Sequence, residues 1–240
     1  MLVKSQIKLI RSLQQKKYRN QHGLFFVEGK KTVQELLDSD FKAHSIYCTA
    51  ANLFAVSDDI LTEISKAELD QISSLKNPNG VLGVFYIPKA KEVDFTDWIV
   101  ALDAVRDPGN LGTIIRLCDW FGIRNLVCSQ MTVDCFNPKV LQATMGSIAR
   151  VNITYVKLVD FLKVSDMKVY GAFMNGASVY ELELPQKGII ILGNEANGIS
   201  TEVEASVTQK VAIPPYGGKT SESLNVATAT AILLHEIRRG

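Results

Sequence analysis

The second half of the chain alternates short apolar runs with segments whose apolar residues recur at helical spacing. Strands that alternate with helices in this way predict a parallel β-sheet covered by helices on both faces, an α/β fold. We expect strands over residues 98–102, 125–128, 151–156, 168–173, 189–192 and 210–213. We expect helices over residues 113–120, 138–147, 159–162, 201–206 and 223–239.

The first 90 residues show a looser α/β pattern. It predicts helices over residues 4–17, 30–37 and 66–75 and strands over 25–27, 45–48, 59–64 and 81–87. The stretch PKAKEVDFTD, residues 88–97, is polar and contains no apolar run, which is typical of a domain boundary. We therefore expect a small domain over residues 1–90, a linker over 91–97 and a larger domain over 98–240.

Composition excludes several classes of protein. Hydrophobic residues make up 47% of the chain, as in a folded protein with a core, yet no apolar run approaches the roughly 20 residues of a membrane helix. The N-terminus lacks the pattern of a secretory signal. The cysteines do not pair as CxxC, so we expect buried, reduced thiols and a cytoplasmic location. The histidines form no metal-ligand pattern, and we expect no metal site.

The net charge of +1 conceals an uneven distribution. Residues 1–31 carry eight basic side chains against Glu28 alone, a net charge of +7, so the remainder carries −6. The basic residues are Lys4, Lys8, Arg11, Lys16, Lys17, Arg19, Lys30 and Lys31. A basic segment on a mildly acidic body indicates contact with a polyanion, and a solvated helix face rich in lysine is the alternative.

Three polar loops follow predicted strands, at residues 103–112, 193–200 and 214–222. Ligands of parallel α/β sheets bind beyond the carboxyl ends of the strands, so these loops are the candidate site. In the first loop, Asn110 can cap the following helix, and Arg116 can bind a phosphate through two hydrogen bonds. An ordinary helix cap with a surface arginine is the alternative.

The second loop, ILGNEANGIS, places Glu195 just past an apolar strand end, where a carboxylate can orient a polar ligand. Gly193 and Gly198 are five residues apart with no glycine between them in the required place, so the dinucleotide-binding pattern GxGxxG is absent. A plain turn that caps the next helix at Ser200 is the alternative.

The third loop contains GGKTS, which invites comparison with a nucleotide-binding P-loop. That motif needs a glycine where this chain has Ile213, so we reject nucleoside triphosphate hydrolysis. What is left is a backbone-rich loop followed by Ser223 and Asn225 at a helix start, where N–H groups are available. The small residues of that helix permit close packing, within the chain or against a second subunit.

At these residues the chain resembles the SpoU (TrmH-like) RNA 2′-O-methyltransferases of the SPOUT class. The resemblance rests on NLGTIIR at 110–116, ILGNEANGIS at 191–200 and IP…ESLNVATATAILL at 213–234, together with FNPKVLQATMGSIARV at 136–151. SLQQKKYRNQHGLFFVEGKKTVQELL, residues 12–37, is similar to the small ribosomal-protein-like RNA-binding domain that many of these enzymes carry.

The resemblance implies a deep trefoil knot in the C-terminal domain, a homodimer formed through that domain, and S-adenosylmethionine as the cofactor. The residues that would hold the cofactor are Leu192, Gly193, Asn194, Ile213, Pro214, Ser223 and Leu224. The catalytic and RNA-contacting positions would be Asn110, Arg116, Glu195, Ser223 and Asn225, and the N-terminal RNA contacts Lys16, Lys17, Arg19 and Lys30. The loop between Pro214 and Ser223 is two residues longer than the commonest family pattern.

The implied reaction moves a methyl group to a ribose 2′-hydroxyl of rRNA or tRNA. None of the three motifs contains a histidine or cysteine that could remove the hydroxyl proton. Arg116 is fully protonated at neutral pH, so we expect it to position a phosphate, and the identity of the base stays open. An RNA-binding protein that kept the fold without catalysis is the alternative function, and no pattern names the RNA or the nucleotide.

Overall fold

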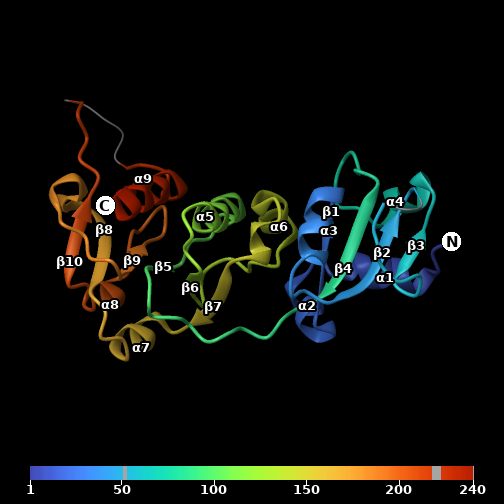
Figure 1. Cartoon of the computed structure of the whole chain (residues 1–240), viewed down its shortest axis with the longest axis horizontal. Helices are drawn as coiled ribbons and strands as arrows, with labels where there is room; N and C mark the ends of the chain where they lie inside the picture. Colours follow the sequence, from blue (N-terminus) through green and yellow to red (C-terminus); the bar gives the residue numbers. More distant parts are fainter. Residues whose placement is uncertain (51–52, 218–222, 240) are drawn as a thin grey trace. The chain divides into compact units, whose positions relative to one another are not determined.

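The computed structural model describes residues 1–50, 53–217 and 223–239. The chain divides into two compact units (Figure 1). The first consists of Met1–Lys89 and Asp134–Ala149, and the second of Ala90–Val133 and Arg150–Gly240. The segment Asp134–Ala149 therefore packs with the N-terminal residues, although its place in the sequence led us to expect it in the larger domain.

The first unit contains a four-stranded sheet in the order β1-β4-β2-β3. β4 (Val81–Tyr86) pairs antiparallel with β1 (Leu24–Glu28) and β2 (Ala43–Cys48), and β3 (Leu61–Glu63) runs parallel to β2. Its apolar core includes Ile10, Phe26 and Leu82. The helical elements are α1 (Lys4–Ser12), α2 (Lys16–His22), α3 (Lys30–Leu37), α4 (Lys66–Ile72), α6 (Pro138–Thr144) and η1 (Ser147–Ala149).

The helix that we expected over residues 4–17 is wrong in its extent, because the chain forms two helices there, α1 and α2. The backbone carbonyl groups of Leu13 and Gln14, at the break, each accept a hydrogen bond of 2.9 Å from Nη1 of Arg19. Leu13 is fully buried. A side chain from the second helix thus satisfies carbonyl groups that the end of the first helix leaves unpaired.

The second unit contains a six-stranded sheet in the order β10-β8-β9-β5-β6-β7, and all five strand pairings are parallel. The predicted α/β class is therefore confirmed. The strands are β5 (Ile99–Leu102), β6 (Asn125–Ser129), β7 (Asn152–Val156), β8 (Val169–Ser178), β9 (Ile189–Leu192) and β10 (Gln209–Ala212). The helical elements are α5 (Pro108–Trp120), α7 (Leu158–Lys163), η2 (Val179–Glu181), α8 (Thr201–Glu204) and α9 (Val226–Arg239).

Helices cover both faces of this sheet: α7 and α8 lie on one side, and α5 and α9 on the other (Figure 1). Ile99 and Ala101 of β5 belong to a buried cluster with Leu158 of α7 and Val203 of α8. Because side chains alternate along a strand, Val100 faces the α5 and α9 side. Since the strands are parallel, the loops after β5, β9 and β10 leave from one edge of the sheet.

Candidate active site

A chain of side-chain hydrogen bonds joins three of the predicted catalytic residues at this edge. Nδ2 of Asn225 donates to Oδ1 of Asn110 at 2.9 Å, and Nδ2 of Asn110 donates to Oε1 of Glu195 at 2.9 Å. Asn110 lies 115 residues from Asn225 and 85 from Glu195 along the chain. The fold therefore brings the first two candidate loops together with the start of α9, which follows the third loop, as expected from their positions after parallel strands.

Asn110 contributes to this chain because another residue caps its helix. Helix α5 begins at Pro108, and the side chain of Asp107 accepts a 2.7 Å hydrogen bond from the backbone N–H of Asn110. The expectation that Asn110 caps the helix was wrong, because α5 begins five residues earlier than predicted. Both ends of the Asn110 amide group are consequently available to Asn225 and Glu195.

Asn225 has two roles at the start of α9. Its Oδ1 accepts hydrogen bonds from the backbone N–H groups of Ala227 (2.9 Å) and Thr228 (3.2 Å), which is the geometry of a helix N-cap. Its amide nitrogen remains to donate to Asn110. The cap thus fixes the orientation of the amide group, and with it the donor that reaches α5.

The loop after β9 is a tight turn that presents Glu195. The backbones of Asn194 and Gly198 exchange two hydrogen bonds of 2.9 Å, and Oδ1 of Asn194 accepts from the N–H groups of Ala196 and Asn197. A Cβ atom on Gly193 would lie 2.1 Å from the backbone of Gly198. Only glycine permits this approach at position 193, so the sequence fixes the shape of the turn.

Sequence reasoning missed a second set of residues that hold the first loop. Oδ2 of Asp103, a buried side chain, accepts a 2.8 Å hydrogen bond from the backbone N–H of Ser200. Ala104 has a φ of 56°, and its carbonyl group accepts a 2.8 Å hydrogen bond from Nδ2 of Asn194. The hydroxyl group of Ser129 accepts a hydrogen bond of 2.9 Å from the N–H of Ala104. A polar residue directly after a buried strand was the available signal.

The other predicted residues differ in their contacts and exposure, and among them Nδ2 of Asn194 donates to Oε2 of Glu195 at 3.4 Å. Arg116 is exposed and has no hydrogen bond or ion pair within the described parts of the chain. Ser223 and Leu224 are exposed, and Ile213 and Pro214 are half-buried. Residues 218–222, which include Ser221 and all of the GGKTS stretch except Gly217, lie outside the described residues.

Of the predicted RNA contacts, Lys16, Lys17 and Lys30 are exposed, but Arg19 is not. The Arg19 side chain is 2% exposed, and its Nη2 lies 2.5 Å from Oδ2 of Asp134. The prediction of an RNA contact for Arg19 was wrong. The residue is instead an internal part of the first unit, because its guanidinium group pairs with a carboxylate and with two carbonyl groups.

The cysteine thiols of the chain lie in the core. All four cysteines are buried and none forms a disulfide, and complete burial raises the pKa of the Cys118 thiol well above its ordinary value. A buried neutral thiol is a poor nucleophile. No group of three His, Cys, Asp or Glu side chains that could hold a metal occurs within residues 1–50, 53–217 and 223–239.

Two family models match this chain. Residues 97–235 match the model of the SpoU rRNA methylase family. The chain belongs to the SpoU family. The SpoU match covers every residue of the Asn225–Asn110–Glu195 chain, and residues 4–83 match an MRM3-like substrate binding domain. The two matched regions do not overlap, and residues 84–96 lie between them.

Full-length relatives agree with this assignment. The 23S rRNA (guanosine(2553)-2′-O)-methyltransferase RlmP of Bacillus subtilis is 31% identical over 95% of this chain and 94% of its own. A TrmH-family protein from Porphyromonas gingivalis superposes with a TM-score of 0.92 at 43% identity, covering 100% of this chain and 99% of its own. The AdoMet-bound rRNA methyltransferase of Sinorhizobium meliloti gives a TM-score of 0.89 at 30% identity, covering 100% and 96%.

Proposed function

We propose that this protein transfers a methyl group from S-adenosylmethionine to a ribose 2′-hydroxyl of rRNA, or of tRNA. The observation that carries the proposal is the hydrogen-bonded chain Asn225–Asn110–Glu195, which joins two loops of a SpoU protein and the start of α9 at one sheet edge. The relative from B. subtilis modifies the 2′ oxygen of a 23S rRNA guanosine, which favours rRNA over tRNA as the substrate.

The loop residues fit an adenosine-containing cofactor. Leu192–Gly193–Asn194, the stretch 213–217 and the stretch 223–225 carry no charged side chain. Tyr216 and Leu224 expose 90% and 46% of their side chains there, so they offer apolar surface to an adenine ring. At Gly193 no side chain fits between the backbone and Gly198, so this position offers only backbone groups. We propose that Leu192, Gly193, Asn194, Ile213, Pro214, Ser223 and Leu224 hold the cofactor.

S-adenosylmethionine supplies an electrophilic methyl group on a sulfonium centre. Held by the three loop segments, it would deliver this methyl group to the ribose 2′ oxygen, and the group that takes up the hydroxyl proton stays unassigned. Glu195, held by Asn110, can orient the ribose or accept a hydrogen bond from it. Arg116 is exposed and cationic, so it is suited to hold an RNA phosphate and place the hydroxyl in line. Ser223 and Asn225 complete the proposed site.

We propose that the first unit binds the RNA. Its match to an MRM3-like substrate binding domain supports this role, and so do the exposed lysines Lys16, Lys17 and Lys30. Electrostatic contacts of this kind give affinity without sequence selectivity. Selection of the nucleotide then depends on which ribose can reach the loops of the second unit.

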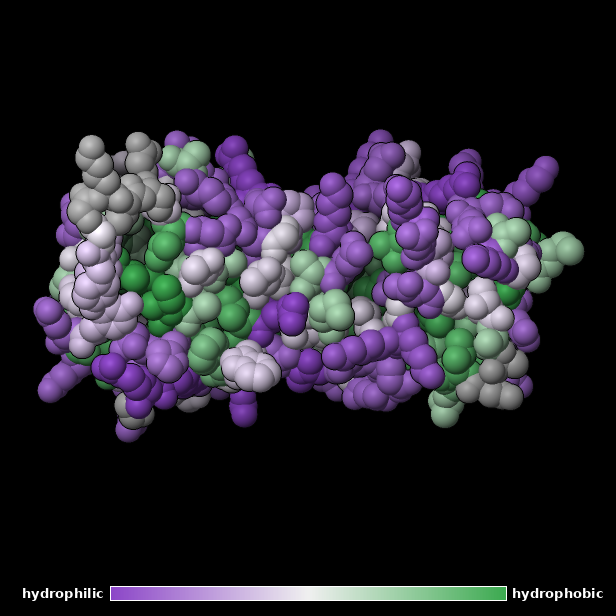
Figure 2. Space-filling model, turned by 90° about the horizontal axis from the view of Figure 1, so that it is seen from above, coloured by the Kyte–Doolittle hydropathy of each residue, from purple (hydrophilic) through white to green (hydrophobic). Residues whose placement is uncertain are grey.

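We further propose a homodimer formed through α5 and α9, a trefoil knot in the C-terminal domain and a cytoplasmic location. Trp120, at the end of α5, exposes 84% of its side chain, and Ala229, Ala231 and Ile232 of α9 are half-buried. Figure 2 shows apolar side chains gathered on this face of the second unit. The chain returns from edge strand β10 to pack α9 against α5, a path that supports the knot. No helix within the described ranges is long and apolar enough to cross a membrane.

The test is methyl transfer from labelled S-adenosylmethionine to an unmodified 23S rRNA transcript. Arg116→Ala should reduce the rate by about 100-fold or more, because it removes charge that positions the nucleophile. Arg124→Ala is the control, since Arg124 is also exposed but precedes β6 at the opposite edge of the sheet. Equal rates for the two variants would remove Arg116 from the site. Absence of cofactor binding in calorimetry would favour an RNA-binding protein without catalysis.

A further inference from the structure

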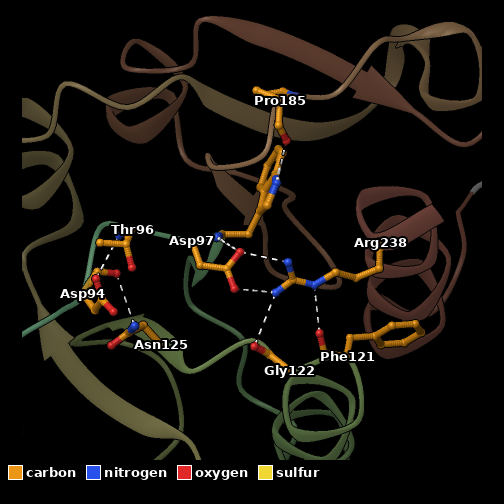
Figure 3. A network of polar contacts seen from close by, with 9 residues as sticks. Asp94, Thr96, Asp97, Phe121, Gly122, Asn125, Pro185 and Arg238 are labelled. Atoms are coloured by element: carbon orange, nitrogen blue, oxygen red, sulfur yellow. Dashed lines mark hydrogen bonds and ion pairs between the residues drawn. The ribbon is translucent and has the colours of Figure 1, made fainter. Parts of the chain in front are cut away.

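The C-terminal turn of α9 takes part in a compact polar cluster (Figure 3). The cluster lies near the amino end of β5, opposite the end from which the loops leave. Arg238 donates from Nη1 and Nη2 to the two carboxylate oxygens of Asp97, at 2.9 and 2.6 Å. It also donates from Nε to the carbonyl oxygen of Phe121 at 2.9 Å and from Nη2 to that of Gly122 at 3.3 Å. One guanidinium group thus joins the end of α9 to two other segments of the second unit, so that three segments meet there.

Those three segments are the far ends of the elements that carry the site. Asp97 lies two residues before β5, whose other end leads to Asp103. Phe121 and Gly122 follow α5, whose first turn holds Asn110. Arg238 lies in the last turn of α9, which begins just after Asn225. α5 and α9 pack together, have 13 and 14 residues, and run in the same direction, since both their starts and their ends are joined by hydrogen bonds.

The cluster is anchored on its strand side. The N–H of Trp98 donates to Oδ1 of Asp97 at 2.7 Å, and Trp98 itself is 1% exposed. Its indole Nε1 donates to the carbonyl oxygen of Pro185 at 2.9 Å. Asp97 therefore cannot follow Arg238 if α9 moves, because its own backbone neighbour is fixed in the core.

The Arg238–Asp97 ion pair contributes little to stability but restricts the geometry of the segments that it joins. Arg238 and Asp97 expose 32% and 36% of their side chains, and ion pairs this accessible contribute only about 0–1 kcal/mol. The planar fork nevertheless restricts geometry, since it satisfies two carboxylate oxygens and two carbonyl groups at once. Each helix is about 20 Å long and stiff, so a shift at one end is transmitted to the other.

We infer that Arg238 is a positioning residue of the proposed methyltransferase, which sets the register of α9 against α5 and so the contact between Asn225 and Asn110. The inference rests on the proposed function for its kinetic consequence. Its structural consequence, the coupling of the two ends of α9, is independent of any reaction.

The experiment compares Arg238→Gln and Arg238→Lys with Arg239→Gln. Arg239 is the matched control, because its Nη2 pairs only with Glu236 of its own helix, at 3.2 Å, among the described residues. For Arg238→Gln we expect the single-turnover methylation rate of a 23S rRNA transcript to fall about tenfold or more with an unchanged KM for RNA. Arg238→Lys should restore little, since an ammonium group cannot bind both carboxylate oxygens and the carbonyl groups. Arg239→Gln should match the unaltered protein.

Hydrogen exchange provides a readout that does not need activity. Arg238→Gln should accelerate amide exchange in the first turns of α9 and α5, about 20 Å from the substitution. Faster exchange confined to the last turn of α9, or an equal effect of Arg239→Gln, would overturn the inference. If the unaltered protein methylated no RNA, the proposed function would fail while the exchange result still decided the role of Arg238.

Discussion

Asn225 donates a 2.9 Å hydrogen bond to Asn110, and this contact links the first turn of α9 to the first turn of α5. The substitution Asn225→Asp removes this hydrogen bond and keeps the helix cap. Aspartate caps a helix as well as asparagine does, so the melting temperature should change little. The amide donor is lost, however, and Asn110 must turn its own amide nitrogen away from Glu195 to meet the new carboxylate.

We therefore expect methyl transfer by Asn225→Asp to fall by about tenfold or more, measured with the folded protein under single-turnover conditions. Asn225→Ala is the companion variant, because it removes the cap as well and should cost about 1 kcal/mol of stability. Full activity in Asn225→Asp would mean that the link between the two helices is dispensable.

Gly193→Ala should greatly weaken cofactor binding. The added Cβ would lie 2.1 Å from the Gly198 backbone, a separation that requires the turn to open. Gly198→Ala is the control: its φ of 68° carries a strain of about 1–2 kcal/mol, but a Cβ there meets no atom within 4 Å. Calorimetric titration with S-adenosylmethionine should show a large loss for the first variant and a small one for the second. The reverse order would place the cofactor elsewhere.

Neutralising Lys16 and Lys17 should weaken RNA affinity and flatten its dependence on salt. Each lysine that contacts a phosphate contributes about one unit to the slope of log K against log salt concentration, so Lys16→Ala with Lys17→Ala should reduce the slope by up to about two. Filter binding at several salt concentrations measures this. An unchanged slope would move the RNA surface away from α2.

Arg19→Ala should act on stability. Removal of a buried cation leaves the Asp134 carboxylate, which is 14% exposed, without its partner, and such losses cost about 3–5 kcal/mol. Denaturant unfolding should therefore show a much lower midpoint, whereas Lys17→Ala should leave it nearly unchanged. A midpoint equal to that of the unaltered protein would show that the internal pair contributes nothing net.

Acid should weaken the contact between Asp97 and Arg238. The hydrogen bonds from Arg238 lower the pKa of Asp97 below its ordinary value of 3.8, and the N–H of Trp98 and the nearby charge of Arg124 act in the same direction. A lowered pKa in the folded state means that the stabilisation is complete above the ordinary value and is lost as the pH falls through the folded value. The melting-temperature difference between the unaltered protein and Asp97→Asn should thus be constant near neutral pH and shrink below a pH of about 4. A difference that persisted unchanged in acid would contradict this.

The elements that sequence predicted best are those with continuous apolar runs. The expected strand over 189–192 coincides with β9, because a buried parallel strand needs apolar residues on both faces. The break between α1 and α2 escaped prediction, since no glycine or proline marks it and the arginine that satisfies its carbonyl groups lies in the next helix. The burial of Arg19 escaped for a related reason: its partner Asp134 is 115 residues away.

The segments that form the candidate site could be predicted from the sequence, but the contacts between their side chains could not. Parallel strands bring their carboxyl ends to one edge, so the three loops could be expected to converge. Which side chains meet depends on where each helix begins, and the start of α5 at Pro108 decides that Asn110 faces Asn225. The contribution of Arg238 could not be foreseen, because it depends on how two helices of nearly equal length align.

The position of β5 within its sheet has a consequence for how the chain folds. One edge of β5 pairs with β6, which begins at Asn125, but the other pairs with β9, which begins only at Ile189. Strand pairing over such a separation is slow, and until β9 is in place an entirely apolar strand has an unpaired edge. We therefore expect the second unit to pass through an aggregation-prone intermediate during synthesis, one that a chaperone could shield until β9 completes the centre of the sheet.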